Sequence, residues 1–173
     1  MPIYDCSLWE YLTVSHAQQR HIPMSTRFKM FEKVLAGLRI IQNTGFRHLD
    51  IKPGNILLNT ENGIWNETDL VITDFGTGGR ADREFGLAGT PGFTSMEQLI
   101  GQAHRKSDNY AFGKLMIMIF GNWATSWNLL YQPVTENERN QIPFNQPVIH
   151  VVRELLKVFI KFCFKISKKK KNF

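Results

Sequence analysis

The chain has 173 residues, of which 43% are hydrophobic and 12% aromatic, so it can bury one domain's core and lacks a disordered composition. Its net charge is +6, but residues 151–173 hold eight Lys or Arg against one Glu, whereas residues 1–150 hold thirteen against fourteen acidic residues. The positive excess belongs to the tail, and the nearly neutral remainder gives no indication of nucleic-acid binding.

The first predicted element is a helix over residues 26–43, where apolar residues recur at helical spacing. Gly45 follows at a place where a glycine commonly ends a helix. Residues 48–55 contain proline and glycine and indicate a loop. Two short apolar stretches, residues 56–58 and 70–72, flank a polar turn region and predict a small β-hairpin.

The next segment, residues 74–97, is rich in glycine, threonine and charge and is typical of a long functional loop. Ser107 is a good N-cap, and the apolar stretch that runs to Phe120 predicts a buried helix. A loop rich in tryptophan and proline is expected next, and a final helix from about Val148. The fold class predicted is therefore mainly α, of the α+β family: a helical bundle with one small β-hairpin.

Four short motifs occur in a fixed order. Residues 48–55 read HLDIKPGN, residues 74–76 read DFG, residues 89–97 read GTPGFTSME and residues 107–113 read SDNYAFG. Together they resemble the protein kinase family: its catalytic loop, its DFG metal-binding turn, its substrate-positioning loop ending in a variant of APE, and its central buried helix. The resemblance extends over nearly all of residues 1–160 and implies a kinase-like C-terminal lobe.

The resemblance implies an enzyme that transfers a phosphoryl group from ATP, with Mg²⁺, to a protein substrate. Asp50 would be the catalytic base, and Lys52 would place a cation beside the transferred phosphate. Asn55 and Asp74 would be the metal ligands, because amide and carboxylate oxygens suit this hard cation. Lys52, Asn55 and Asp74 would also bind the nucleotide, with Leu57 under the adenine ring.

The same resemblance gives supporting roles to three further residues. His48 and Phe75 would belong to a stack of apolar side chains that aligns the lobes, and Asp108 would hold the catalytic-loop backbone. Taken singly, the motifs have simpler readings, since residues 74–76 could be an ordinary strand-ending turn. Residues 76–81 also satisfy a GxGxxA dinucleotide pattern, but no helix pattern opens after it, and the four motifs together favour the kinase interpretation.

The substrate class follows from two details of the resemblance. A lysine at position 52 is typical of serine/threonine kinases, and so is the Gly-Thr-Pro run that contains Thr90. Thr90 is expected to contact Asp50 and Lys52. Dual specificity stays open, as do the physiological substrate, the pathway and the oligomeric state.

The sequence departs from the family at several places. Leu49 stands where most members have an arginine that binds an activation-loop phosphate, so we predict that activation-loop phosphorylation is not the main switch. No glycine-rich loop, strand lysine or partner glutamate can be placed before Asp50, and residues 1–12 resemble the hinge and the first C-lobe helix. The N-lobe is therefore expected to be absent, which would cost much of the rate. In the family, the residue at Glu97 pairs with a buried arginine near the end of the domain. No arginine follows Arg153 in this sequence, and Arg153 comes too early for that role.

The expected domains are a partial kinase domain over residues 1–160 and a basic, Lys-rich tail over residues 161–173. A basic stripe approaches the tail at i,i+4 spacing: Arg153, Lys157, Lys161 and Lys165. It could be the solvated face of a C-lobe helix or a weak membrane-surface contact. The Lys-, Phe-, Ile- and Asn-rich composition would also fit translated non-coding sequence.

Two functions from different classes stay in view: a protein serine/threonine kinase, and a catalytically inactive, pseudokinase-like docking module. A membrane- or nucleic-acid-associated basic protein is a weaker third, resting on the tail alone. Cys6 and Cys163 lie far apart and the five histidines are scattered, so neither a disulfide framework nor a zinc site is predicted. Because no signal-peptide pattern or transmembrane run is visible either, a cytoplasmic location is expected.

Overall fold

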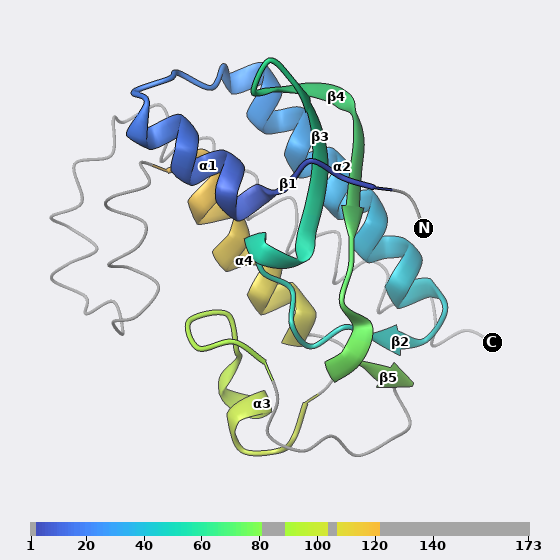
Figure 1. Cartoon of the computed structure of the whole chain (residues 1–173). Coiled ribbons are helices and arrows are strands. Elements are labelled where there is room, and N and C mark those ends of the chain that lie inside the picture. Colours follow the sequence, from blue (N-terminus) through green and yellow to red (C-terminus); the bar gives the residue numbers. More distant parts are fainter. Residues whose placement is uncertain (1–2, 81–88, 104–106, 122–173) are drawn as a thin grey trace, which may run out of the picture. The chain divides into compact units, whose positions relative to one another are not determined.

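The computed structural model describes residues 3–80, 89–103 and 107–121. Within these ranges the chain forms helices and two small antiparallel sheets (Figure 1). The expected helix from Val148, the Trp-rich loop before it, the basic stripe and the Lys-rich tail all lie outside the described residues.

The elements follow one another in this order: β1 (Cys6–Ser7), α1 (Leu8–Ala17), α2 (Met24–Asn43), β2 (Phe46–Arg47), the 3₁₀ turn η1 (Pro53–Asn55), β3 (Ile56–Glu61), β4 (Ile64–Ile72), the 3₁₀ turn η2 (Phe75–Thr77), β5 (Gly79–Arg80), α3 (Met96–Leu99) and α4 (Ser107–Phe120).

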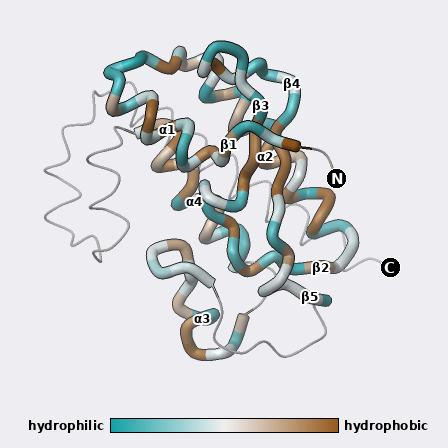
Figure 2. Tube along the Cα trace, in the orientation of Figure 1, coloured by the Kyte–Doolittle hydropathy of each residue, from teal (hydrophilic) through white to brown (hydrophobic). Residues whose placement is uncertain are grey.

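Helix α2 confirms the helix that was predicted over residues 26–43, and it begins two residues earlier. Its inward face is buried at positions three or four residues apart, which include Met30, Val34 and Leu38. This face packs against β4 and α4. The change between hydrophobic and hydrophilic residues along the helix is visible in Figure 2. Gly45 adopts a φ of 75°, the left-handed conformation in which glycine follows a helix end.

The predicted hairpin is present but longer than its apolar stretches indicated. Strands β3 and β4 pair from Ile56 opposite Ile72 to Glu61 opposite Ile64. Asn62 and Gly63 form the connection with φ values of 50° and 73°, as a two-residue turn of this hand requires. Trp65, 2% exposed, lies in β4 and donates from its indole nitrogen to the carbonyl oxygen of Asp69 at 3.1 Å.

Two further strand pairs place the loops that carry the motifs. Strand β1 adds to the hairpin as its third strand, in the order β1-β3-β4. Strands β2 and β5 form a separate pair, with Phe46 opposite Arg80. Gly78 precedes β5, and a Cβ atom there would run into the backbone of Arg47 and the ring of Phe46. A glycine is therefore needed for the segment after residue 74 to approach the segment before residue 48.

Helix α4 confirms the buried helix predicted from Ser107 to Phe120. Its aromatic side chains meet those of α2: the Phe31 and Phe112 ring centroids lie 5.6 Å apart, and those of Phe28 and Phe120 lie 5.1 Å apart. Nine of its fourteen residues are buried, including Asp108 at its first turn. The helix thus sits in the core, and its polar N-terminal end is available to hold a neighbouring loop.

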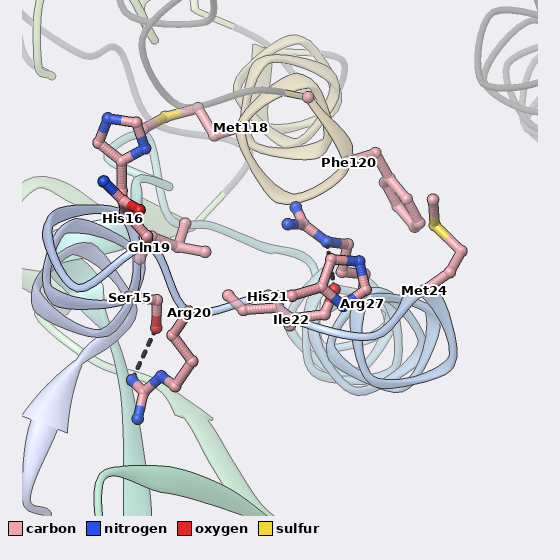
Figure 3. Close-up of a pocket in the computed structure, with 12 residues that line it drawn as sticks. Ser15, His16, Gln19, Arg20, His21, Ile22, Met24, Arg27, Met118 and Phe120 are labelled. Atoms are coloured by element: carbon pink, nitrogen blue, oxygen red, sulfur yellow. Dashed lines mark hydrogen bonds between the residues drawn. The ribbon is translucent and has the colours of Figure 1, made fainter. Parts of the chain in front are cut away.

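A cavity of about 580 Å³ lies where the end of α1, the start of α2 and the end of α4 meet (Figure 3). Arg27 crosses it, donating from Nε to the carbonyl of Ile22 at 3.1 Å and from Nη1 to the carbonyl of Ile119. Burial lowers the pKa of the Arg27 guanidinium. None of the described residues of the four motifs lines this cavity, and Arg27 here ties the end of α4 to the α1–α2 connection.

Candidate functional site

A compact cluster joins Asp50, Lys52 and Thr90. The ammonium of Lys52 lies 2.7 Å from Asp50 Oδ2 and 2.8 Å from the Thr90 hydroxyl, and that hydroxyl donates to Asp50 Oδ1 at 2.6 Å. Asp50 is 6% exposed, so its charge is held mainly by these partners and not by water. The expected contact of Thr90 with both Asp50 and Lys52 is confirmed.

Asn55 completes the cluster from the end of η1. Its side-chain nitrogen donates to the backbone carbonyl of Asp50 at 2.9 Å and to Asp50 Oδ2 at 3.0 Å. Both bonds come from the amide nitrogen, and the amide oxygen makes no hydrogen bond to any described residue. The short turn over Pro53–Asn55 brings Asn55 back beside Asp50.

The electrostatic state of Asp50 follows from these contacts. Partial burial alone would raise its pKa, because it penalises the charged form. The hydrogen bonds from Lys52, Thr90 and Asn55, with the charge of Lys52, outweigh burial and hold the pKa of Asp50 below its ordinary value. Asp50 is therefore a carboxylate at neutral pH.

The backbone that leads into Asp50 is held by Asp108 from the first turn of α4. The two oxygens of Asp108 accept from the backbone N–H groups of His48 at 2.9 Å and Leu49 at 2.7 Å. The expected contact between Asp108 and the loop backbone is confirmed. Burial raises the pKa of the Asp108 carboxyl above its ordinary value, although the two N–H donors act in the opposite direction.

His48 connects the two loops through both ring nitrogens. Its Nδ1 accepts from the backbone N–H of Asp50 at 3.3 Å, and its Nε2 lies 2.9 Å from the carbonyl oxygen of Thr73. Together these bonds assign the neutral tautomer with the proton on Nε2. The ring also contacts Phe75 at a centroid distance of 4.7 Å, as their membership of one stack predicts. The resemblance had indicated the stacking but not the hydrogen bonds.

Asp74 lies on the segment that these bonds place beside Asn55. The N–H of Thr73 donates to the backbone carbonyl of Asn55 at 2.9 Å, so the two loops run side by side directly before Asp74. Asp74 itself is exposed and adopts a φ of 63°, and its Oδ1 accepts from Gly76 N at 3.4 Å. Its carboxylate has no cationic partner among the described residues.

The donor set on these two loops fits a magnesium ion. An amide oxygen at Asn55 and a carboxylate at Asp74 are hard oxygen ligands, and magnesium commonly takes only one or two protein ligands and completes its shell with water and phosphate. In the described part of the chain, no group of three or more His, Cys, Asp or Glu side chains could hold a metal. The assignment of Asn55 and Asp74 as metal ligands stays a prediction.

Leu57 occupies the middle of the sheet formed by β1, β3 and β4. It lies opposite Ser7 of β1 and Val71 of β4, and its side chain is partly exposed, whereas Ile56 and Leu58 are fully buried. The alternation of β3 thus turns Leu57 to the other face of the sheet. Its assignment to an adenine site stays a prediction.

Some contacts around the site were not foreseen from the sequence. Arg47 donates from Nη1 to the carbonyl of Ala103, and Gln98 donates from Nε2 to the carbonyl of Leu49 at 2.6 Å. Gly89 lies so close to Gln98 that a Cβ there would be 2.6 Å from its amide nitrogen. Neither Arg47 nor Gln98 belongs to the residues that the resemblance singled out, and no spacing rule connects them to the catalytic loop.

Comparison with known proteins settles the class. The chain matches the family described as "Protein kinase domain" over residues 3–172, and it therefore belongs to the protein kinase domain family. The described helices and small antiparallel sheets are accordingly parts of a kinase domain fold.

Three curated relatives illustrate the range of similarity. The chain is 29% identical over 176 aligned positions to "Serine/threonine-protein kinase ssp1" of Schizosaccharomyces pombe, an alignment that covers 91% of this chain and 24% of that protein. It is 34% identical over 130 positions to "L-type lectin-domain containing receptor kinase V.9" of Arabidopsis thaliana, covering 68% and 18%. It is 27% identical over 150 positions to "Eukaryotic translation initiation factor 2-alpha kinase 1" of Mus musculus, covering 72% and 23%. The chain thus spans less than a third of the length of these relatives.

None of the described helices is both long enough and apolar enough to cross a bilayer.

Proposed function

We propose that this chain carries the catalytic residues for ATP-dependent phosphoryl transfer to serine or threonine hydroxyls of protein substrates. The observation that carries the proposal is the Asp50, Lys52 and Thr90 cluster, with Asn55 bonded to the same carboxylate. A buried carboxylate, a cation and an amide within hydrogen-bond reach of one another are the groups that positioning and charge stabilisation of a phosphoryl group require.

Each residue has a task in this proposal. Asp50, ionised at neutral pH, orients the attacking hydroxyl and accepts its proton as the hydroxyl oxygen bonds to the γ-phosphorus. The bond from that phosphorus to the bridging oxygen breaks, and ADP leaves. Lys52 stands 2.7 Å from the same carboxylate and places its positive charge beside the transferred group.

Asn55 and Asp74 would hold Mg²⁺, which when bound neutralises charge on the ATP phosphates. Asn55 bonds Asp50 through its nitrogen, and its oxygen makes no hydrogen bond within the described residues. Leu57, partly exposed beside β1, would contact the adenine ring. A protein substrate is the partner that this chemistry implies, and an intracellular location stays a prediction.

We also propose that residues 1–160 correspond to the hinge and C-lobe of the kinase domain. In support, two helices, α1 and α2, and two short strands, β1 and β2, precede the catalytic-loop motif in the described part of the chain. In this proposal the groups that a glycine-rich loop and a strand lysine supply in kinases come from outside residues 1–160, and full activity requires them.

One observation favours a second candidate, a non-catalytic docking module. The first glycine of the sequence is Gly37, so residues 1–36 contain no glycine-rich segment that could cover the ATP phosphates. Unless such a segment is supplied from elsewhere, these residues would bind other proteins and would not catalyse transfer.

A ligand-dependent thermal shift separates the two candidates. The purified chain is heated with millimolar Mg·ATP, with ATP plus EDTA, and without nucleotide. The proposal expects Mg·ATP to raise the Tm, because a ligand that binds only the folded state stabilises it. Asp74→Asn should abolish the rise, whereas Asp69→Asn, which changes an exposed carboxylate of β4, should keep it. No rise at millimolar Mg·ATP would favour the docking module.

A direct assay tests transfer itself. In a preparation that supplies the groups expected from outside residues 1–160, radiolabelled phosphate from ATP should appear on serine or threonine of a general protein substrate. Asp50→Asn should abolish the labelling while the variant still gains Tm with Mg·ATP. Labelling that survives in Asp50→Asn would show that another residue, or a contaminating kinase, performs the reaction.

A further inference from the structure

The peptide group between Leu49 and Asp50 is held at both ends by side chains. Its carbonyl oxygen, on Leu49, accepts from Gln98 Nε2 at 2.6 Å, and its N–H, on Asp50, donates to His48 Nδ1 at 3.3 Å. On the other side of Leu49, the backbone N–H donates to Asp108 at 2.7 Å. Three side chains from three parts of the chain therefore fix the backbone that carries Asp50.

Leu49 needs this restraint because its backbone is unfavourable. It has a φ of 65°, in the left-handed region that costs free energy for a residue with a Cβ atom. A leucine there returns to an ordinary conformation, and rotates the adjoining peptide group, unless its polar groups are held. The conformation before Asp50 thus depends on the bonds that Leu49 makes.

Gln98 is placed to supply the bond to the carbonyl. It is 1% exposed, in the short helix α3, and the Gly89 backbone packs against both ends of its hydrogen bond. A Cβ atom at position 89 would lie 2.6 Å from Gln98 Nε2 and 2.9 Å from the Leu49 oxygen, so only a glycine leaves the bond room. Thr90 comes directly after Gly89 and donates to the Asp50 carboxylate.

We propose that Gln98 is a positioning residue for Asp50, acting through the Leu49–Asp50 peptide group. Segment 89–98 then restrains Asp50 through two hydrogen bonds. The Thr90 hydroxyl donates to its carboxylate, and the Gln98 amide donates to the carbonyl of the peptide group that precedes it. When the substrate-positioning loop packs in this position, the same hydrogen bonds orient the proposed base, Asp50. This inference rests on the proposed function for its meaning, but the Gln98 contact can be tested without activity.

The test measures hydrogen exchange of the Asp50 amide by NMR, as a protection factor corrected for the intrinsic pH dependence. Gln98→Met keeps the length of the side chain and removes the donor, and it should lower the protection about tenfold. Leu99→Met, on the same helix with a 52% exposed side chain, is the matched control and should leave the protection unchanged.

Gln98→Glu adds a readout that a packing role would not move. Ionised, the introduced carboxyl repels the Leu49 carbonyl, whereas protonated it donates an O–H bond in place of the amide. Protection at Asp50 should therefore be lost at pH 8 and return as the pH falls toward the glutamate range of about 4–5, a range that burial moves upward. His48, Asp50 and Asp108 are present in every variant, so Gln98→Met measured at the same pH values corrects for any effect of these neighbouring groups.

The outcomes are decisive in either direction. Wild-type protection in Gln98→Met, or protection in Gln98→Glu that does not recover at low pH, overturns the proposal. Should Gln98→Met fail to fold, the pH profile of Gln98→Glu decides, with wild type at the same pH values as the control. In an active preparation Gln98→Met should lower kcat and leave the KM for ATP unchanged. A lost Mg·ATP thermal shift in the wild type would instead count against the proposed function, so the two failures are distinguishable.

Discussion

The hydroxyl of Thr90 donates a 2.6 Å hydrogen bond to Oδ1 of Asp50, forty positions earlier in the chain, and accepts one from Lys52 at 2.8 Å. One small side chain thereby hydrogen-bonds both the carboxylate of Asp50 and the ammonium of Lys52. Because the bond to the carboxylate favours its charged form, the segment that carries Thr90 helps to set the ionisation of the proposed base.

Removal of this hydroxyl should therefore raise the pKa of Asp50. Thr90→Val keeps the shape of the side chain and loses both hydrogen bonds, whereas Thr90→Ser retains them and is the control. An NMR titration of the Asp50 carboxyl carbon should give a higher pKa in Thr90→Val than in wild type, and a value near wild type in Thr90→Ser. The same pKa in Thr90→Val and wild type would show that the hydroxyl does not hold the charge.

The lowered pKa of Asp50 also predicts a pH dependence of stability. A carboxyl whose pKa is lower in the folded than in the unfolded chain stabilises the fold above the unfolded value, about 3.9, and loses that contribution as the pH falls through the folded value. Wild type should therefore gain more unfolding free energy relative to Asp50→Asn at pH 7 than at pH 3. Urea denaturation at both pH values measures it, and a difference that does not change with pH contradicts the assignment.

Asp108 should be important for stability as well as for the site. Asp108→Asn has one acceptor where the carboxylate has two, so either His48 or Leu49 loses the partner of a buried N–H. We expect the free energy of unfolding to fall by about 1–3 kcal/mol. Urea denaturation provides the measurement, with Asp69→Asn as an exposed control that should change it by less than about 0.5 kcal/mol.

Phosphorylation of the loop should not activate the protein. Leu49 is 3% exposed and offers no cation for a phosphate. The Thr77 hydroxyl donates to the carbonyl of His48, and the Thr90 hydroxyl donates to the carboxylate of Asp50. The Thr94 hydroxyl donates to the carbonyl of Thr90. A phosphate would remove these donors and bring negative charge toward Asp50.

Phosphatase treatment of an active preparation should accordingly not lower its activity, with mass spectrometry to confirm that the phosphates are gone. A strong gain of activity on phosphorylation of Thr77, Thr90 or Thr94 would contradict the role given to Leu49.

The local elements could be predicted because their signals are local. The helix over residues 26–43 and the pairing of residues 56–58 with 70–72 follow from apolar spacing, and both are present. The hairpin was underestimated because residues 59–69 are mostly polar, although Asn62-Gly63 is itself a turn signal. Strand β1 has two residues and no periodicity, so only its partner β3 makes it a strand.

The order of four motifs was enough to place the chain in its family and to nominate Asp50, Lys52, Asn55 and Asp74, since the chemistry requires those residue types. What the sequence could not contain is the connection between distant positions: that His48 bonds Asp50 and Thr73 at once, that Gln98 holds the carbonyl of Leu49, and that Leu49 keeps a left-handed backbone. These depend on which loops the packing of α4 and the sheets brings within hydrogen-bonding distance of one another. A hydrogen bond forms only where the fold brings donor and acceptor together, and residue types alone do not specify which distant residues become neighbours.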